Sequence, residues 1–143
     1  MLDWKKYLLA VIAVFVVSTA VGYVIHEVLL AADYARSTLW RAPEELWKRM
    51  ILVYFAQLIF ALVFCYIYTK GVEFEKHWLG QGIRFGLLVA TLLFVPGALV
   101  LYAVLQVGLS MAVKWIIFGY GQMMIAGVVA AAIYRPPAGL PHP

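Results

Sequence analysis

Four uninterrupted apolar stretches divide this chain, and each is long enough to cross a lipid bilayer as a single helix. A bilayer core about 30 Å thick requires roughly 20 apolar residues in helical conformation. A transmembrane β-strand would instead alternate apolar and polar residues over about 10 positions. The pattern therefore predicts an all-α fold, an integral membrane bundle of four transmembrane helices in a single domain. The predicted spans are about residues 7–30, 50–68, 83–105 and 113–134.

The composition agrees with a membrane location and argues against several other classes of protein. Hydrophobic residues make up 66% of the 143 residues and charged residues only 13%, whereas soluble domains average about 45–50% and about 25%. The net charge of +4 is small and scattered, without a basic run of five or more. We therefore expect membrane lipids as partners and no nucleic acid. The single cysteine, Cys65, excludes an intramolecular disulfide and a Cys-pair metal or redox motif.

The segments outside the spans suggest how the chain enters and leaves the membrane. Lys5 and Lys6 precede the first apolar stretch, which continues past a signal-peptidase-like Ser-Thr-Ala, so we expect an uncleaved first helix. Pro43, followed by two glutamates, predicts a short helix that runs into the second span. The proline-rich tail at 136–143 is predicted to be a loose end. Four spans place both termini on one side, and the two lysines favour the cytoplasm.

Small residues mark one face of the third span. Gly82, Gly86 and Ala90 repeat every four residues, which allows two helix backbones to approach closely in a membrane. The partner helix is either in the same chain or in a second copy, so a homodimer or a larger membrane complex remains open. Pro96 and Gly97 interrupt the same span and predict a kink.

Polar side chains inside the spans are the candidate functional residues, because such groups are costly in lipid. With a cytoplasmic N-terminus, polar residues of all four spans lie at a similar depth in the outer half of the membrane. Among these residues Glu27 is acidic, and Arg36 and Arg41 are its candidate partners. We predict a ligand-binding site formed by His26, Glu27, Tyr54, Gln57, Tyr102, Tyr120 and Gln122.

The known templates for catalysis and metal binding are missing from the sequence. His26 and Glu27 are adjacent and cannot share one helical face as the histidines of HExxH do. His77 falls on the opposite side of the membrane, and His142 is in the tail. We therefore predict no catalytic residue, no metal site and no cofactor, and enzymatic activity is the least favoured interpretation. The alternative for His26 and Glu27 is a hydrated pair near the membrane surface.

Three segments together resemble a known type of protein: "GYVIHEVLLAADY" in the first span, "WLGQGIRFGLLVA" entering the third, and "IYRP" closing the fourth. The combination is similar to small uncharacterised bacterial inner-membrane proteins with four predicted helices, a domain-of-unknown-function family. The resemblance extends over nearly the whole chain. It implies a multi-pass location in the bacterial inner (cytoplasmic) membrane and a compact four-helix unit, and it assigns no activity to any residue.

Three functions follow as hypotheses. The first is a non-enzymatic protein that binds a small hydrophobic or amphipathic ligand in an outer-half pocket, because a polar ring around an apolar cavity suits such a ligand. The second is an accessory or assembly subunit of a larger membrane complex, favoured by the small size and the glycine face. The third is a dimeric proton-coupled small transporter or channel that uses His26 and Glu27.

Overall fold

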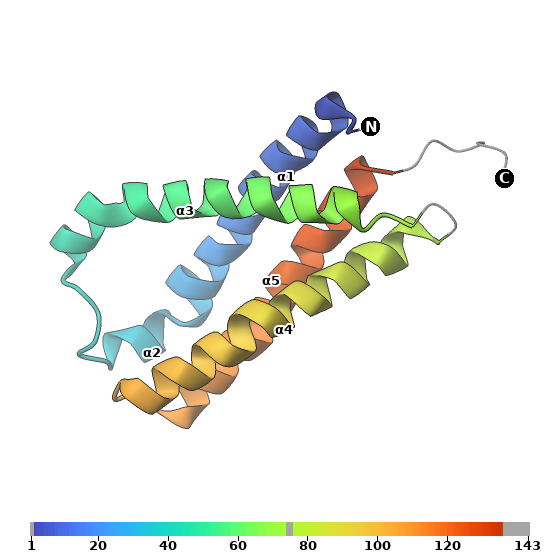
Figure 1. The fold of residues 1–143 in the computed structure, drawn as a ribbon. Helices are drawn as coiled ribbons and strands as arrows, with labels where there is room; N and C mark the ends of the chain where they lie inside the picture. The colour runs from blue at the N-terminus through green and yellow to red at the C-terminus, as the bar shows by residue number, and fades with distance from the viewer. Residues whose placement is uncertain (1, 74–75, 136–143) are drawn as a thin grey trace, which may run out of the picture.

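The computed structural model describes residues 2–73 and 76–135, and it folds them into helices and connecting turns without a β-strand (Figure 1). The helices are, in chain order, α1 (Trp4–Tyr23), the π-helix η1 (Val24–Leu29), α2 (Ala31–Ala35), α3 (Pro43–Lys70), α4 (Trp78–Val104) and α5 (Leu109–Ile133). The predicted tail at 136–143 lies outside the described residues.

Four of these segments are long and apolar enough to cross a membrane: α1 continued by η1, then α3, α4 and α5. The predicted all-α four-helix bundle is confirmed, with the arrangement of a multi-pass membrane protein. Each helix begins several residues before the apolar stretch that predicted it, because polar and aromatic residues add turns at the ends. The largest difference is in α3, which begins at Pro43 with Glu44 and Glu45 in its first turn. The predicted helix leading into the second span is thus the first part of α3.

Helices α4 and α5 lie side by side and form the most extensive helix–helix contact among the described residues (Figure 1). A Cβ atom built on Gly127 would lie 2.2 Å from the carbonyl oxygen of Gly82, and one on Gly86 would lie 2.4 Å from that of Met123. Neither distance leaves room for a methyl group. The small-residue face predicted for the third span therefore packs inside the chain, against α5.

The buried core lies toward the end of the bundle that carries the chain termini. There α1 contacts both α5 and the second half of α3. Small and aromatic side chains fill this region, and Cys65 is buried among them as a free thiol. The core consists of Tyr7, Ala10, Val11, Val14, Ala61, Phe64, Cys65, Tyr68, Ala90, Met123, Ala126, Ala130 and Ala131.

Helix α3 packs against the bundle through its second half only. Its buried residues are Ala61, Phe64, Cys65 and Tyr68, whereas the side chains from 43 to 59 are exposed or only partly covered. Figure 1 shows the first half of α3 diverging from the other long helices. A helix of 28 residues is roughly 42 Å long, which exceeds a bilayer core of about 30 Å and favours a tilted orientation. The divergence leaves the half of the bundle opposite the chain termini open. We call this the open half, and the half that contains the buried core the closed half.

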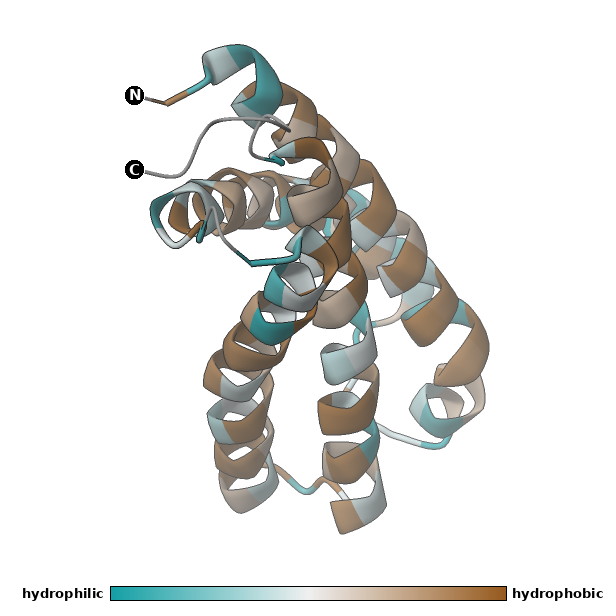
Figure 2. Ribbon diagram, turned by 90° about the vertical axis from the view of Figure 1, so that its right-hand side faces the viewer, coloured by the Kyte–Doolittle hydropathy of each residue, from teal (hydrophilic) through white to brown (hydrophobic). Residues whose placement is uncertain are grey.

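Both ends of the described chain meet at the same end of the bundle, as four crossings require. The backbone N–H of Asp3 donates to the Tyr134 hydroxyl over 3.2 Å, and Lys6 Nζ donates to the Arg135 carbonyl over 3.1 Å. Hydrophilic residues gather mainly toward the helix ends, whereas the long helices are apolar over most of their length (Figure 2). The cytoplasmic orientation of this end stays a prediction.

Candidate functional site

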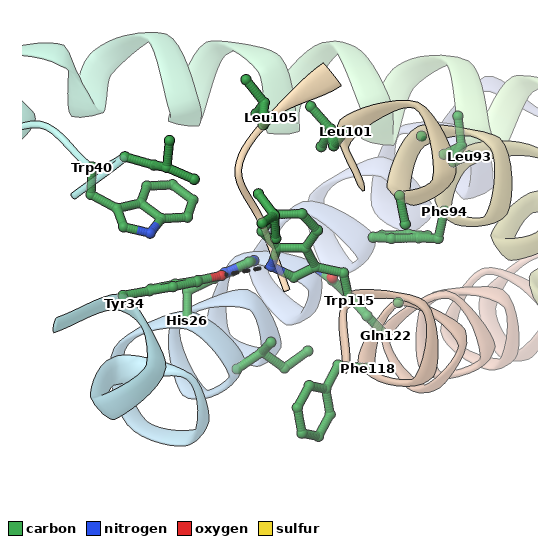
Figure 3. A pocket seen from close by; sticks show the side chains of 16 residues that line it. His26, Tyr34, Trp40, Leu93, Phe94, Leu101, Leu105, Trp115, Phe118 and Gln122 are labelled. Atoms are coloured by element: carbon green, nitrogen blue, oxygen red, sulfur yellow. Dashed lines mark hydrogen bonds between the residues drawn. The ribbon is translucent and has the colours of Figure 1, made fainter. Parts of the chain in front are cut away.

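A cavity of about 480 Å³ lies at the end of the bundle opposite the chain termini (Figure 3). Its walls come from η1, α2, the connection that follows α2, the last turns of α4 and the first half of α5. Several lining side chains, such as Trp40 and Leu101, remain exposed, so the cavity opens outward. The lining is Ile25, His26, Tyr34, Leu39, Trp40, Leu93, Phe94, Gly97, Ala98, Leu101, Leu105, Val107, Trp115, Phe118, Gly119 and Gln122.

The π-helix η1 positions the histidine of this cavity. The backbone N–H of Leu30 donates to the carbonyl of Ile25 over 2.9 Å, five residues earlier instead of four. The wider turn places Ile25 and Leu30, which are both buried, on the same side of the helix. His26 lines the cavity, whereas the adjacent Glu27 does not. Single π turns inside α-helices often occur at functional sites.

His26, Tyr34 and Trp115 form a hydrogen-bonded group inside the cavity. The Tyr34 hydroxyl lies 2.6 Å from His26 Nδ1 and accepts a hydrogen bond from Trp115 Nε1 over 3.1 Å. Figure 3 shows the three side chains converging on the Tyr34 oxygen from three separate helices. The group therefore links η1, α2 and α5 through one hydroxyl.

The donors and acceptors of this group assign the tautomer of His26. An indole N–H can only donate, so Trp115 occupies a lone pair of the Tyr34 oxygen. The oxygen has a second lone pair that an Nδ1–H could use, but the hydroxyl proton would then lack a partner, so we assign the hydroxyl as the donor and His26 Nδ1 as the acceptor. A neutral imidazole with an accepting Nδ1 carries its proton on Nε2. Within the described residues no hydrogen bond reaches His26 Nε2, so the ring keeps one unused donor.

Aromatic side chains give the cavity its shape. The rings of Tyr34 and Trp40 lie 4.4 Å apart between centroids, and those of His26 and Tyr34 lie nearly parallel, 5.9 Å apart. On the opposite side, the ring of Phe94 covers Gly119, where a Cβ atom would lie 2.3 Å from the ring. The glycine on α5 thus makes room for the phenyl ring on α4. Pro96 lies inside the continuous helix α4, one residue before the lining residues Gly97 and Ala98.

A second groove of about 460 Å³ lies between α3, α4 and α5 and adjoins this cavity at Gln122. The buried Gln122 side chain donates from Nε2 to the carbonyl of Ser18 over 3.0 Å. Gln57 of α3 lines the groove, and both amide nitrogens approach Gly22, where a Cβ atom would lie 3.4 Å from Gln122 Nε2 and 3.9 Å from Gln57 Nε2. The cavity and the groove share Leu93, Phe94 and Gln122.

The structure brings together some of the seven residues predicted for the site and separates the others. His26 and Gln122 line the cavity, and Gln57 lines the adjoining groove. The remaining four line neither space. Tyr120 instead forms a 2.6 Å hydrogen bond with Thr91. Arg41, a predicted partner of Glu27, pairs with Glu45. Glu27, Tyr54 and Tyr102 are exposed, and so is His26, although it lines the cavity.

The sequence reasoning missed Tyr34, Trp40 and Trp115 as cavity residues. Tyr34 and Trp40 lie in the connection between the first two predicted spans, and Trp115 lies near the start of the fourth, so none of them was a polar residue inside a span. One signal was present: Tyr34 follows His26 by eight residues, and such a spacing places both near one face of a helix that carries an extra residue in one turn. In the structure all three line the cavity, with Tyr34 and Trp115 partly buried and Trp40 at its exposed edge.

No aspartate, glutamate, lysine or arginine lines the cavity in the described part of the chain. The nearest ion pair lies beside it, where Lys114 Nζ contacts Asp33 Oδ2 over 2.7 Å and ties α2 to α5. Burial raises the pKa of the Tyr34 hydroxyl, although the hydrogen bond from Trp115 opposes the shift, so the hydroxyl stays protonated near neutral pH. Residues 2–73 and 76–135 contain no cluster of ligands able to hold a metal ion.

Comparison with family models, with curated proteins and with solved structures found no match for this chain.

Proposed function

We propose that the protein is a non-enzymatic membrane protein that binds a small amphipathic lipid in the cavity beside His26. One observation carries the proposal: a largely apolar cavity of about 480 Å³ contains one hydrogen-bonded polar group, His26–Tyr34–Trp115, with the Gln122 amide on its wall. Ligand sites have volumes of about 300–1,000 Å³ and combine apolar walls with a few fixed polar groups. This cavity has both properties.

The position of the cavity suits a ligand that arrives through the membrane. The first half of α3 diverges from α4 and α5, and the second groove occupies the gap that results. A lipid can therefore place its polar end near His26 and its chain along the groove beside Phe94. The ligand-binding role predicted for Gln57 and Gln122 would consist of lining this path.

A cavity-filling substitution tests the proposal. A side chain at Gly97 meets open space, since no atom lies within 4 Å of a Cβ built there, and Gly97 lines the cavity. We expect Gly97→Leu to fold normally and to lose the lipid that copurifies with the wild-type protein in mild detergent. Mass spectrometry of the extracted lipids measures the amount bound per protein.

The matched control is Gly80→Leu on the same helix, which also meets open space but lies outside the cavity. It should retain the wild-type amount of lipid. Equal lipid content in the wild type and both variants, together with unchanged unfolding midpoints across a panel of lipids, would contradict the proposed function.

A further inference from the structure

The charge and hydrogen-bond pattern of the cavity narrows the chemical class of its ligand, provided that the proposed binding function is correct. Among the described residues, no lining side chain carries a formal charge. A charged headgroup moved into such a site would lose its hydration without gaining a counter-charge. The cavity therefore suits a neutral ligand better than a fatty acid or a phospholipid.

Two polar groups line the cavity: the Gln122 amide, which donates to the Ser18 carbonyl, and the His26–Tyr34–Trp115 group, whose unused atom is a donor. Tyr34 and Trp115 satisfy each other and His26 Nδ1, and His26 Nε2–H is left without a partner in the described chain. An N–H group inside an apolar cavity is stabilised by an acceptor oxygen. A carbonyl is such an acceptor, and it brings no donor of its own that the site would have to satisfy.

The walls around this donor are flat and aromatic. Tyr34 stacks on His26, Trp40 lies against Tyr34, and Trp115 completes the polar corner. Rings pack favourably against rings in offset-stacked or edge-on geometry. Beyond this corner the cavity adjoins, at Phe94, the second groove, which is apolar apart from Gln57 and Gln122. The space therefore fits a flat headgroup followed by an aliphatic chain.

We infer that the ligand is a neutral lipid whose headgroup is a flat ring bearing a carbonyl oxygen, as in a quinone-type lipid, and that His26 Nε2–H donates to this oxygen. The ring lies against Tyr34 and Trp40, and the aliphatic chain follows the groove along α3. His26 distinguishes this class from purely apolar lipids, and the absence of charge distinguishes it from ionised ones.

Three probes that share a ring and a chain isolate each element of this inference. They are 4-decylacetophenone, which has the carbonyl, decylbenzene, which lacks it, and 4-decylbenzoate, which is charged. Binding is measured on the full chain in nanodiscs as the rise in unfolding midpoint at equal mole fractions of probe, since a ligand of the folded state stabilises it. We expect the acetophenone to bind roughly tenfold more tightly than decylbenzene, the effect of about one hydrogen bond.

Two substitutions at position 26 assign the preference to the histidine donor. His26→Leu removes the N–H and should abolish the preference for the acetophenone over decylbenzene. His26→Gln keeps an amide N–H close to the position of Nε2 and should restore part of it. Tyr120→Phe, on α5 but outside the cavity, is the control and should bind all three probes as the wild type does.

The outcomes separate this inference from the function on which it rests. Equal binding of the neutral probes, blocked by Gly97→Leu, would overturn the carbonyl assignment and leave the lipid-binding function standing. Tightest binding of the benzoate would also overturn it. Failure of every probe to stabilise the wild-type chain would contradict both proposals.

Discussion

The two halves of this bundle are built on opposite packing principles. In the half that carries the chain termini, Gly82, Gly86 and Gly127 bring the backbones of α4 and α5 into contact. In the other half, aromatic side chains and the π turn of η1 hold the helices apart around a cavity. The same helices α4 and α5 run through both halves, so the difference lies in the residues along them.

Phe94 and Gly119 mark where the first arrangement gives way to the second. At this contact a glycine of α5 still allows close approach to α4, as the glycines of the closed half do. The group that approaches it is the Phe94 ring, whereas in the closed half it is the backbone of the other helix. Beyond it the lining residues of α4 and α5 face the cavity. Lipid offers helices little hydrophobic incentive to associate, so close backbone packing must supply stability. The closed half therefore stabilises the fold, and the open half is free to hold a ligand.

The largest difference in stability is expected when one methyl group is added to α4 in each of the two halves. Gly86→Ala puts a Cβ atom 2.4 Å from the Met123 carbonyl oxygen, whereas Gly97→Ala places it in open space. We expect Gly86→Ala to lower the free energy of unfolding by about 3 kcal/mol, since the helix backbones must separate. Gly97→Ala should be neutral or should gain up to about 1 kcal/mol from helix propensity.

Reversible unfolding in detergent with increasing denaturing surfactant measures both variants. Gly121→Ala on α5, which also meets nothing within 4 Å, is a second neutral control. If Gly86→Ala and Gly97→Ala had the same stability, the division into a closed and an open half would be wrong.

The next largest effect on stability is expected at the hydrogen-bonded group of the open half, His26–Tyr34–Trp115. Tyr34→Phe removes one hydroxyl and leaves both His26 Nδ1 and Trp115 Nε1 without their partner. Two unsatisfied groups predict a loss of about 2 kcal/mol in the free energy of unfolding. Tyr120→Phe is the matched control, because its hydroxyl bonds only Thr91, whose own hydroxyl also contacts the Leu87 carbonyl. A cost for Tyr120→Phe as large as that for Tyr34→Phe would remove the special role of the polar group.

The sequence was sufficient to predict the membrane fold and the packing face of the third span. Length and apolarity determine a spanning helix, and the repeat of Gly82, Gly86 and Ala90 indicated the packing face of the third span. The length of an apolar span and the repeat of small residues can each be recognised within one segment of the sequence. Whether the glycine face met another part of the chain or a second copy required the structure, because spacing along one helix carries no information about the partner helix.

The candidate site was only partly accessible from the sequence, for two physical reasons. A wheel with 100° per residue assumes an unbroken α-helix, whereas η1 adds an extra residue to one turn exactly where His26 lies. Depth alone also cannot distinguish a side chain that faces the cavity from one that faces outward. Gln122 and Tyr54 were predicted at similar depth, and only Gln122 lines the cavity.

A smaller effect is expected at the ion pair beside the cavity. Lys114 and Asp33 join α5 to α2, with the Asp33 side chain 27% exposed. Asp33→Asn should lower the free energy of unfolding by less than about 1 kcal/mol, as for other solvent-accessible pairs. The difference from the wild type should shrink when unfolding is repeated in high salt, which screens such charges. A loss that salt does not change would indicate that the asparagine disrupts packing rather than an ion pair.

The smallest effect is expected at the opposite end, where Glu73 contacts both Lys76 and Arg84 on the exposed surface of the closed half. Hydrogen bonds from Lys76 and from Arg84 lower the pKa of the Glu73 carboxyl. A carboxyl whose pKa is lower in the folded state stabilises the fold above its unfolded pKa of about 4.3, and this stabilisation is lost as the pH falls through the folded pKa.

Glu73→Gln should therefore be slightly less stable than the wild type at neutral pH, and the two should converge as the pH falls below about 4. Unfolding midpoints measured from neutral to acidic pH test this, with Glu44→Gln as a control in the unpacked half of α3. A difference that stayed constant across this range would show that Glu73 acts through packing and not through its charge. Convergence would show that the Glu73 pairs, like the Asp33–Lys114 pair, make minor, screened contributions to stability. The main contribution would then come from the glycine contacts between α4 and α5.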